Sequence, residues 1–381
     1  MPQTAIPAVF MRGGTSNALV FHRRDLPSDP ALWPALFRGA MGSPDPNGRQ
    51  LNGMGGGVSS LSKVCVVGPP SRDDADIDYS FFQIGVRDDS VDTSGNCGNM
   101  SSAMGPFALD EGLVTPPPDG ADAVVRIHNT NTAKIIVARF ATENGRARVM
   151  GDFALDGVAG HGAPIRLEFL DPGGAGTGRL LPTGRSVDHL NVPGLGQVAV
   201  SMVDAANPCV FVAAASIGQD GAALPDALEA DPACLHKLES IRRAASVAMG
   251  LARDIDHAGQ IPSIPKVAMI CPPQAAPTLS GRRLDPTDHD IAIRMISVGQ
   301  PHRAVPLTGG ICLGVAVRIP GSLPQQLARA GTGPIRVGHP SGVLTVDAAV
   351  RVAQGQAPHA VHGAVYRSAR RLFEGRVLIP G

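Results

Sequence analysis

The sequence predicts an α+β protein with two pseudosymmetric halves, each a curled, mainly antiparallel sheet around one central helix. Short β-branched runs bounded by turn residues recur in both halves, which is typical of strands. Two similar segments, one in each half, pass from a glycine-rich turn into a small, apolar, helix-compatible run. Glycine (46 residues) and proline (34) are abundant and aromatic residues make up only 4%, which favours short strands and tight turns.

The length of 381 residues exceeds the size at which a single hydrophobic core usually stops growing, so two domains are expected. The stretch 173–193 is rich in proline and glycine and is the expected boundary. We predict an N-terminal domain over residues 1–186 and a C-terminal domain over residues 187–360. The last segment, 361–381, is a candidate to return to the first domain.

Strands are expected wherever β-branched and apolar residues cluster between turn signals. These segments are 124–127, 134–140, 197–203, 209–213, 266–271 and 344–350. The clearest outer helix begins after Asp231, a suitable N-cap, with Pro232 at the first helical position. We expect that helix to be structural.

The two central helices are expected after Ser94-Gly-Asn-Cys-Gly-Asn in the first half and within Leu307-Thr-Gly-Gly-Ile-Cys in the second. Alanine and glycine dominate both runs, and a narrow helix lets the surrounding strands approach closely.

The charge pattern argues against several classes of partner. The chain has 33 basic and 33 acidic residues and no basic run, so neither nucleic acid nor a membrane surface is an expected partner. The N-terminus lacks a cationic start followed by an apolar core, which predicts a cytoplasmic protein without a signal peptide. No apolar run approaches the roughly 20 residues that span a bilayer.

The motif search predicts neither a metal nor an organic cofactor. The six cysteines form no Cys-x-x-Cys pair, and no His-Glu-x-x-His or dense Asp/His cluster is present. Arg12-Gly-Gly-Thr-Ser-Asn17 lacks the spacing of a nucleotide-binding P-loop. Gly194-Leu-Gly-Gln-Val-Ala199 precedes a strand and follows a proline, so we interpret it as a hairpin and not as a dinucleotide fingerprint. The absence of Gly-x-Ser-x-Gly weakens a serine hydrolase hypothesis.

Cys97 is the first candidate for chemistry, because it stands directly before the first central helix. Unpaired amides and the helix dipole stabilise an anion at such a position, which makes a thiol there a usable acid or base. The amides of Gly98 and Asn99, and in the second half those of Thr308, Gly309 and Gly310, are candidates to bind substrate carboxylates. The alternatives are that Cys97 is a small core residue and that the glycines serve turn geometry or packing.

Lys63 is the second candidate, because it lies at the head of the apolar run Lys63-Val-Cys-Val-Val, where a solvated amine is not the usual occupant. Burial beside polar groups lets a lysine exchange protons near neutral pH. The alternative is a solvated lysine at a strand end.

Six motifs in order along the chain together resemble the PrpF family. They are Met11-Arg-Gly-Gly-Thr-Ser, Gly42-Ser-Pro-Asp, Leu61-Ser-Lys-Val, Ser94-Gly-Asn-Cys-Gly-Asn, Gly338-His-Pro-Ser-Gly and Arg367-Ser-Ala-Arg-Arg-Leu-Phe-Glu-Gly. The family includes 2-methylaconitate isomerases, methylitaconate isomerases and 4-oxalomesaconate tautomerases. It shares the diaminopimelate epimerase-like fold, which agrees with the two halves inferred above.

The resemblance implies that Lys63 and Cys97 are the catalytic residues, since they match the family's lysine and cysteine. By looser similarity to the epimerases, it implies that Ser16, Gln83, Asn207 and the turn of Thr308, Gly309 and Gly310 face the substrate. Asn17 replaces the usual family lysine, and Gln50-Leu-Asn-Gly replaces the common Gln-Ile-Asp-Gly. The epimerases carry a second catalytic cysteine where this chain has Leu307.

The resulting hypothesis is a cofactor-independent isomerase, of the 2-methylaconitate isomerase type, that moves a proton and a double bond in a small unsaturated di- or tricarboxylate. A methylitaconate isomerase and a 4-oxalomesaconate tautomerase are alternatives within the family. A two-base epimerase or racemase and a noncatalytic polycarboxylate-binding protein are the rivals outside it. The expected partners are a small polycarboxylate substrate and, in a homodimer, a second copy of the chain.

Overall fold

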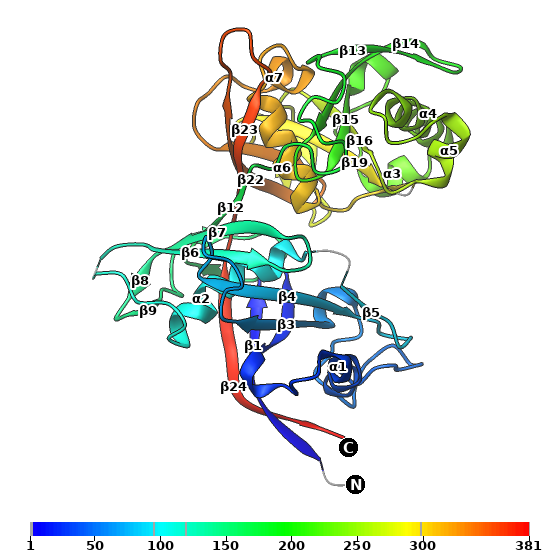
Figure 1. Ribbon diagram of the computed structural model, residues 1–381. Helices are drawn as coiled ribbons and strands as arrows, with labels where there is room; N and C mark the ends of the chain where they lie inside the picture. Colours follow the sequence, from blue (N-terminus) through cyan, green and yellow to red (C-terminus); the bar gives the residue numbers. More distant parts are fainter. Residues whose placement is uncertain (1–2, 94–95, 119, 298, 381) are drawn as a thin grey trace. The chain divides into compact units, whose positions relative to one another are not determined.

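The structure, a computed structural model, describes residues 3–93, 96–118, 120–297 and 299–380. The chain divides into two compact units, Met1–Glu168 with Tyr366–Gly381, and Phe169–Val365 (Figure 1). It leaves the first unit within β12 (Ile165–Leu170) and returns within β23 (His359–Arg367). The domain limits expected from the sequence, at residues 186 and 360, stay a prediction.

The first unit is a curled sheet around helix α2. Its main strands, in sheet order, are β24 (Ala369–Ile379), β1 (Thr4–Gly13), β2 (Ser16–His22), β3 (Lys63–Gly68), β4 (Ile77–Ile84), β6 (Ala123–Asn129) and β7 (Lys134–Phe140). The β2–β3 and β4–β6 pairs are parallel, and the other neighbours are antiparallel. The short β5 (Val91–Asp92) extends β4.

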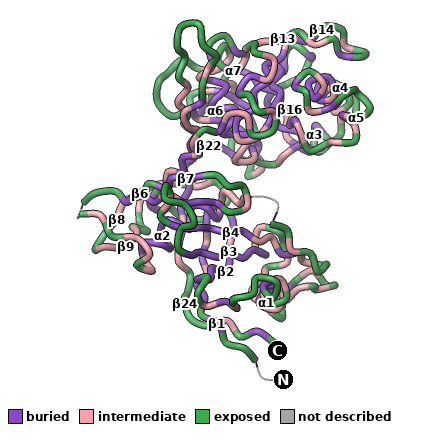
Figure 2. The backbone as a smooth tube through the Cα atoms, in the orientation of Figure 1, coloured by how far each residue is buried: buried purple, intermediate pink, exposed green. Residues whose placement is uncertain are grey.

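Helix α2 (Gly98–Asp110) is buried on all sides from Met100 to Leu109 and packs against strands from both ends of this sheet (Figure 2). Small side chains make this possible. A Cβ at Gly105 would lie 2.8 Å from the Phe140 ring and 2.9 Å from the Ala138 methyl, so the helix can approach β7 only as glycine. Helix α1 (Trp33–Met41) packs separately, with Phe37 stacked on Phe21 of β2.

The second unit repeats the arrangement around helix α6 (Leu307–Val317), which is also buried along its length. Its main strands, in sheet order, are β13 (Asp188–Val192), β14 (Gly196–Asp204), β15 (Pro208–Ala213), β16 (Lys266–Cys271), β19 (Ile291–Ser297), β21 (Ile335–His339), β22 (Gly342–Arg351) and β23. The β15–β16 and β19–β21 pairs are parallel, and the others are antiparallel.

The second unit contains further helices, which are α3 (Pro225–Glu229), α4 (Pro232–Ala248), α5 (Ile255–Gln260) and α7 (Leu323–Leu327). Of these, α4 and α7 pack against strands of the second sheet. The remaining strands are short: β20 (Gln300–Pro301) and the pairs β8 (Thr142–Glu143) with β9 (Arg146–Ala147), β10 (Phe153–Ala154) with β11 (His161–Gly162), and β17 (Ala276–Pro277) with β18 (Arg283–Leu284). Single 3₁₀ turns span Arg23–Asp25, Pro30–Leu32, Ser59–Leu61 and Ala214–Ile217.

The elements predicted from the sequence are confirmed. Each of the six predicted strands lies within β6, β7, β14, β15, β16 or β22. The Asp231 side chain caps α4 by accepting a hydrogen bond from the Cys234 amide at 2.9 Å, with Pro232 at the first helical position. The segment Gly194-Leu-Gly-Gln-Val-Ala199, which resembles a dinucleotide fingerprint, lies in the β13–β14 hairpin as predicted. No helix in the described part of the chain has both the length and the apolar character that crossing a membrane requires.

Candidate active site

Cys97 is the N-cap of α2, as its position in the sequence predicts. Its extended backbone (φ −98°, ψ 97°) leaves the side chain outside the helix, where it makes no capping hydrogen bond. The Cys97 carbonyl accepts a hydrogen bond from the Ser101 amide at 2.9 Å, which starts the helix. The thiol is half-buried, whereas Cys65, Cys209, Cys234, Cys271 and Cys312 are buried. Ser94 and Gly95 of the motif lie outside the described residues.

The β1–β2 hairpin lies against the first turn of α2. A Cβ at Gly13 would lie 2.7 Å from the Asn99 carbonyl oxygen, and one at Gly14 only 2.4 Å from Asn99 Oδ1. Gly14 also has a φ of +51°, so both space and backbone require glycine. Asn99 Nδ2 donates to Thr15 Oγ1 at 3.0 Å. Ser16, 3% exposed, follows directly and pairs with Gly13.

Lys63 begins β3 and is 8% exposed. Its Nζ donates to Gln83 Oε1 at 2.5 Å and lies 5.0 Å from the centre of the Phe81 ring. The Gln83 amide nitrogen donates to the carbonyls of Ser59 and Ser62, each at 3.0 Å. Because both of its donors are used, Gln83 presents its oxygen to the lysine, and it therefore fixes the position of the amine.

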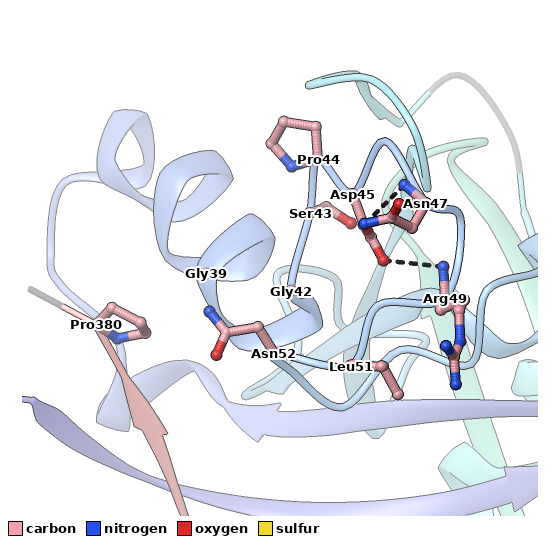
Figure 3. A pocket seen from close by; sticks show the side chains of 10 residues that line it. All are labelled: Gly39, Gly42, Ser43, Pro44, Asp45, Asn47, Arg49, Leu51, Asn52 and Pro380. Carbon is pink, nitrogen blue, oxygen red and sulfur yellow. Dashed lines mark hydrogen bonds between the residues drawn. The ribbon is translucent and has the colours of Figure 1, made fainter.

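The loop before Lys63 contains two of the family motifs. Gln50 is 1% exposed, and its amide nitrogen donates to Ser43 Oγ and Ser62 Oγ, both at 2.7 Å. The Asp45 carboxylate accepts the amides of Asn47, Arg49 and Gln50, and these backbone hydrogen bonds lower its pKa. This loop lines a cavity of about 690 Å³, and neither Lys63 nor Cys97 is among the residues that line it. Figure 3 shows the lining residues.

Two buried groups, the Cys65 thiol and the Tyr79 hydroxyl, interact with the candidate residue Cys97. Cys65 follows Lys63 by two positions, so alternation along β3 places both on one side of the strand. Cys65 interacts electrostatically with Cys97 and with Lys63, which places the three groups in one neighbourhood. Its thiol lies 3.9 Å from the Tyr79 hydroxyl. Burial raises the pKa of Cys65 and the pKa of Tyr79 well above their ordinary values, so both stay neutral at neutral pH.

Sequence reasoning missed Cys65, Tyr79 and Asn131. The Asn131 side chain forms two hydrogen bonds with the Phe81 backbone, accepting from its N–H and donating to its C=O, each at 2.8 Å. It therefore holds the part of β4 that carries Tyr79 and Phe81. The two-residue period of β3 was a sufficient signal for Cys65. Asn131 lies about 50 positions from its partner, and no local pattern marks it.

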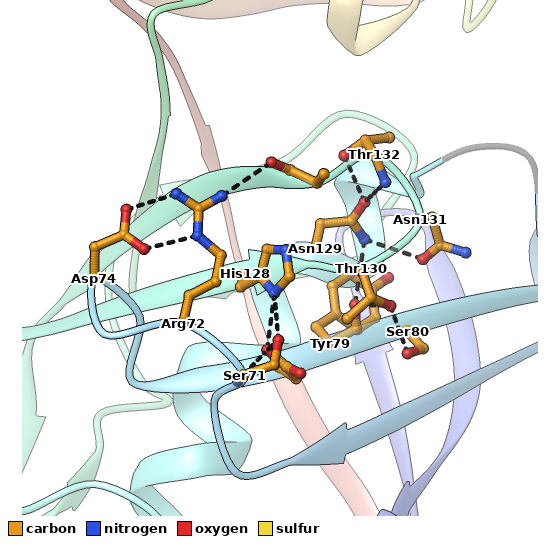
Figure 4. Close-up of polar contacts among 12 residues, drawn as sticks. Ser71, Arg72, Asp74, Tyr79, Ser80, His128, Asn129, Thr130, Asn131 and Thr132 are labelled. Carbon is orange, nitrogen blue, oxygen red and sulfur yellow. Dashed lines mark hydrogen bonds and ion pairs between the residues drawn. The ribbon is translucent and has the colours of Figure 1, made fainter.

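Ser71 and His128, labelled in Figure 4, bind each other and Asp78, but the three residues do not form a hydrolytic triad. Asp78 Oδ1 and Ser71 Oγ lie 2.9 Å and 3.3 Å from the same ring nitrogen, His128 Nδ1. A nucleophilic serine requires the opposite nitrogen. The group is a buried hydrogen-bonded network that connects the neighbouring strands β4 and β6.

In the second unit, Thr308, Gly309 and Gly310 form the first turn of α6, after Pro306 as N-cap. A Cβ at Gly309 would lie 2.6 Å from Met295 Sδ, and one at Gly310 2.6 Å from Leu344, so both glycines serve close packing. Asn207 follows Ala206 in the β14–β15 hairpin, and its side chain donates to the Pro208 carbonyl at 3.2 Å.

Cys312 is buried inside α6, and its thiol donates to the Val203 carbonyl at 3.3 Å. Burial raises the pKa of Cys312 well above its ordinary value, so it is not an acid or base at neutral pH. Among the described residues, no group of three or more His, Cys, Asp or Glu side chains is arranged to hold a metal ion.

Comparison with known proteins identifies the family of the chain. The family described as PrpF protein matches residues 3–380. The 2-methyl-aconitate isomerase of Cupriavidus necator is 40% identical over 100% of this chain and 98% of its own length. The 3-methylitaconate isomerase of Eubacterium barkeri is 38% identical over 99% of this chain and 98% of its own length. The crystal structure of a methylitaconate-delta-isomerase covers 100% of this chain and 96% of that one, with a TM-score of 0.91 and 37% identity.

The fold and these relatives define the class, an isomerase with the diaminopimelate epimerase-like fold. Within that class, the chain belongs to the PrpF family. A further relative, the 4-oxalomesaconate tautomerase of Pseudomonas putida, is 36% identical over 100% of this chain and 97% of its own length.

Proposed function

We propose that the protein is a cofactor-independent isomerase that moves a proton and a carbon–carbon double bond in a small unsaturated di- or tricarboxylate, with 2-methylaconitate as the leading substrate. The 40% identity to a 2-methyl-aconitate isomerase supports this choice. Methylitaconate and 4-oxalomesaconate are the alternatives, because relatives named for those substrates are 38% and 36% identical.

The observation that carries the proposal is the arrangement of two proton-exchanging groups in the first unit. The half-buried Cys97 thiol stands at the start of a buried helix. The Lys63 amine is fixed by Gln83, and both groups interact with Cys65. Two such groups suit a reaction in which one proton leaves a carbon atom and one proton arrives at another.

In the proposed reaction, Lys63 or Cys97 acts as a base and removes a proton from the carbon next to the double bond. The electron pair of the broken C–H bond spreads over the allylic system and its carboxylate as a dienolate. A proton from Lys63 or Cys97 then bonds to the far end of that system, and the double bond shifts without net change in protons. The Gly98 and Asn99 amides, at the positive end of α2, would hold a substrate carboxylate.

The other predicted contacts remain part of the proposal. Ser16, Asn207 and the turn of Thr308, Gly309 and Gly310 are proposed to contact the substrate. For Gln83, the hydrogen bonds support positioning of Lys63 as its main role.

A two-base epimerase is less well supported. Such an enzyme needs a second reactive cysteine at the start of the second central helix, where this chain has Pro306 and Leu307. Cys312 lies deeper in α6 and uses its thiol to bind the Val203 carbonyl.

The homodimer and the cytoplasmic location also stay proposals. Strand β24, which pairs with β1, exposes Leu372, Phe373 and Leu378, each more than 40% accessible, and an interface would cover such side chains. Sedimentation velocity would measure the state of assembly.

The test is to incubate purified protein separately with 2-methylaconitate, methylitaconate and 4-oxalomesaconate in heavy water, following ultraviolet absorbance and deuterium incorporation. We expect one substrate to be converted with label at the allylic carbon, and a chelator not to abolish turnover. Conversion of none of the three, with a folded protein, would contradict the proposal. Cys97→Ala is the control for contaminating activity.

A further inference from the structure

Arg367, the last residue of β23, is a buried cation that pairs with no carboxylate in the described part of the chain. It is 7% exposed. Its Nε donates to Asn99 Oδ1 at 3.1 Å, and its Nη1 donates to the Tyr366 carbonyl at 2.9 Å. Both acceptors are neutral, and no ion pair involves Arg367 among the residues that the structure describes. Because a buried charge is costly unless an opposite charge compensates it, an anion is expected beside this guanidinium.

The surrounding structure holds Arg367 firmly. Arg12 donates to the carbonyl and the hydroxyl of Ser368, the residue that follows Arg367, at 2.9 and 3.1 Å. It also donates to the Gly14 carbonyl at 2.8 Å. A Cβ at Gly14 would lie 3.2 Å from the Arg367 side chain. Asn99, which accepts from Arg367, donates to Thr15. Three motifs from distant parts of the sequence thus meet at the first turn of α2.

Cys97 is the candidate for the missing anion, because it caps α2 two positions before Asn99, whose side chain binds Arg367. Burial lowers the pKa of Arg367 by more than the interaction with Cys97 raises it, and the net result is a pKa of about 10. The guanidinium therefore stays charged at neutral pH. Cys65 on β3 and Tyr79 on β4 also interact with Cys97, but burial raises the pKa of each and keeps them neutral. Lys63 interacts with Cys65. Arg367 is therefore a positively charged group that interacts directly with Cys97.

We infer that Arg367 is a positioning residue that provides the positive counter-charge for the Cys97 thiolate and orients Asn99 at the start of α2. The inference rests on the proposed function for its catalytic use. The thiolate itself can be measured without turnover, which separates the two.

The test measures the rate of iodoacetamide alkylation of Cys97 from pH 5 to 10 by peptide mass spectrometry. The proteins compared are the wild type, Arg367→Gln, Arg367→Met and Arg367→Lys. Loss of an opposite charge at close range should move the pH midpoint of alkylation upward by about 1 to 3 units in both neutral variants. Arg367→Lys should stay near the wild type because it keeps the charge. Two neutral variants are used because methionine suits the buried position if glutamine prevents folding.

Arg376→Gln is the matched control, since it removes one positive charge from the exposed part of β24. Its midpoint should equal that of the wild type. An unchanged midpoint in the folded neutral variants would overturn the inference, and so would a shift of equal size in Arg367→Lys. A shifted midpoint in a protein that converts none of the three substrates would support the inference and contradict the proposed function.

Discussion

The two units have the same strand arrangement, yet their central helices begin in different ways. In the first, α2 lies between β4 and β6 in the sequence and begins at a half-buried cysteine. In the second, α6 lies between β19 and β21 and begins at Pro306. Each helix is buried by small residues, so burial serves packing in both. The difference at the helix start shows that one fold can place a half-buried thiol at the start of one central helix and a proline, with no titratable side chain, at the start of the other.

The lysines at the heads of the corresponding strands sharpen this comparison. Lys63 begins β3 and Lys266 begins β16, and each strand runs parallel to the preceding strand of its sheet. Lys63 is fixed by Gln83, whose register partner it is. Lys266 pairs in register with Cys209 of β15, and burial lowers the pKa of Lys266.

The largest expected difference between the halves concerns the two cysteines. Cys97→Ala should lower kcat by about 10²- to 10⁴-fold, the usual contribution of one proton-transfer group. Cys312→Ala should leave turnover near the wild type and cost about 1 kcal/mol in the free energy of unfolding, because it removes a buried thiol. Steady-state kinetics and urea titration measure both. Full turnover in Cys97→Ala would refute the comparison, as would an inactive but folded Cys312→Ala.

Lys63→Met should reduce kcat by at least about 10²-fold, because it removes the second proton-exchanging group. Lys266→Met, at the corresponding position of the second unit, is the matched control and should keep most of the activity. Both variants need a far-ultraviolet circular dichroism check, and equal losses in the two would show that a lysine at this strand position has a structural role.

The β1–β2 hairpin of the first unit and the β14–β15 hairpin of the second should change in stability in opposite directions when glycine and alanine are exchanged. Gly14→Ala places a Cβ 2.4 Å from Asn99 Oδ1 at a φ of +51° and should lower the free energy of unfolding by about 1–3 kcal/mol. Ala206 has a φ of +60°, so Ala206→Gly should relieve strain and raise it by up to about 1 kcal/mol. Urea unfolding of both variants measures the pair. A change of the same sign in both would count against this reading of the hairpins.

The smallest expected effect concerns acid stability of the second unit. Burial lowers the pKa of His289 and the pKa of His302, and each has a buried ring nitrogen that finds no hydrogen-bond partner among the described residues. Protonation then favours the unfolded state, so stability should fall as the pH drops below about 6.5, the ordinary histidine value. His289→Gln with His302→Gln should reduce that loss in urea titrations between pH 7 and 5. The exposed His189→Gln is the control and should leave the pH profile unchanged.

Much of the fold could be predicted from the sequence because the signals for strands and helix starts are local. Lys134–Phe140 and Lys266–Cys271 were predicted to the residue, since turn residues bound each apolar run. The position of Cys97 as an N-cap followed from its place before a small apolar run. These features depend on neighbours a few positions away, so the local order of residues along the chain indicates them.

The partners of the candidate residues could not be predicted in the same way. Arg367 meets Asn99 across 268 positions, and Asn131 meets Phe81 across 50. Such contacts depend on how the sheet curls, which no short pattern encodes. The packing role of Gly309 and Gly310 also became visible only with Met295 and Leu344 in place.

The order in which the chain visits its two units has a consequence for synthesis on the ribosome. Strand β24 pairs with β1 along almost its whole length, yet it emerges only after all of the second unit. The nascent first unit therefore waits with β1 lacking this neighbour, and Arg367 arrives in the same late segment. A released chain that ends at Val365 should contain a complete second unit, able to fold, and a first unit without β24 that alkylating reagents and proteases still reach.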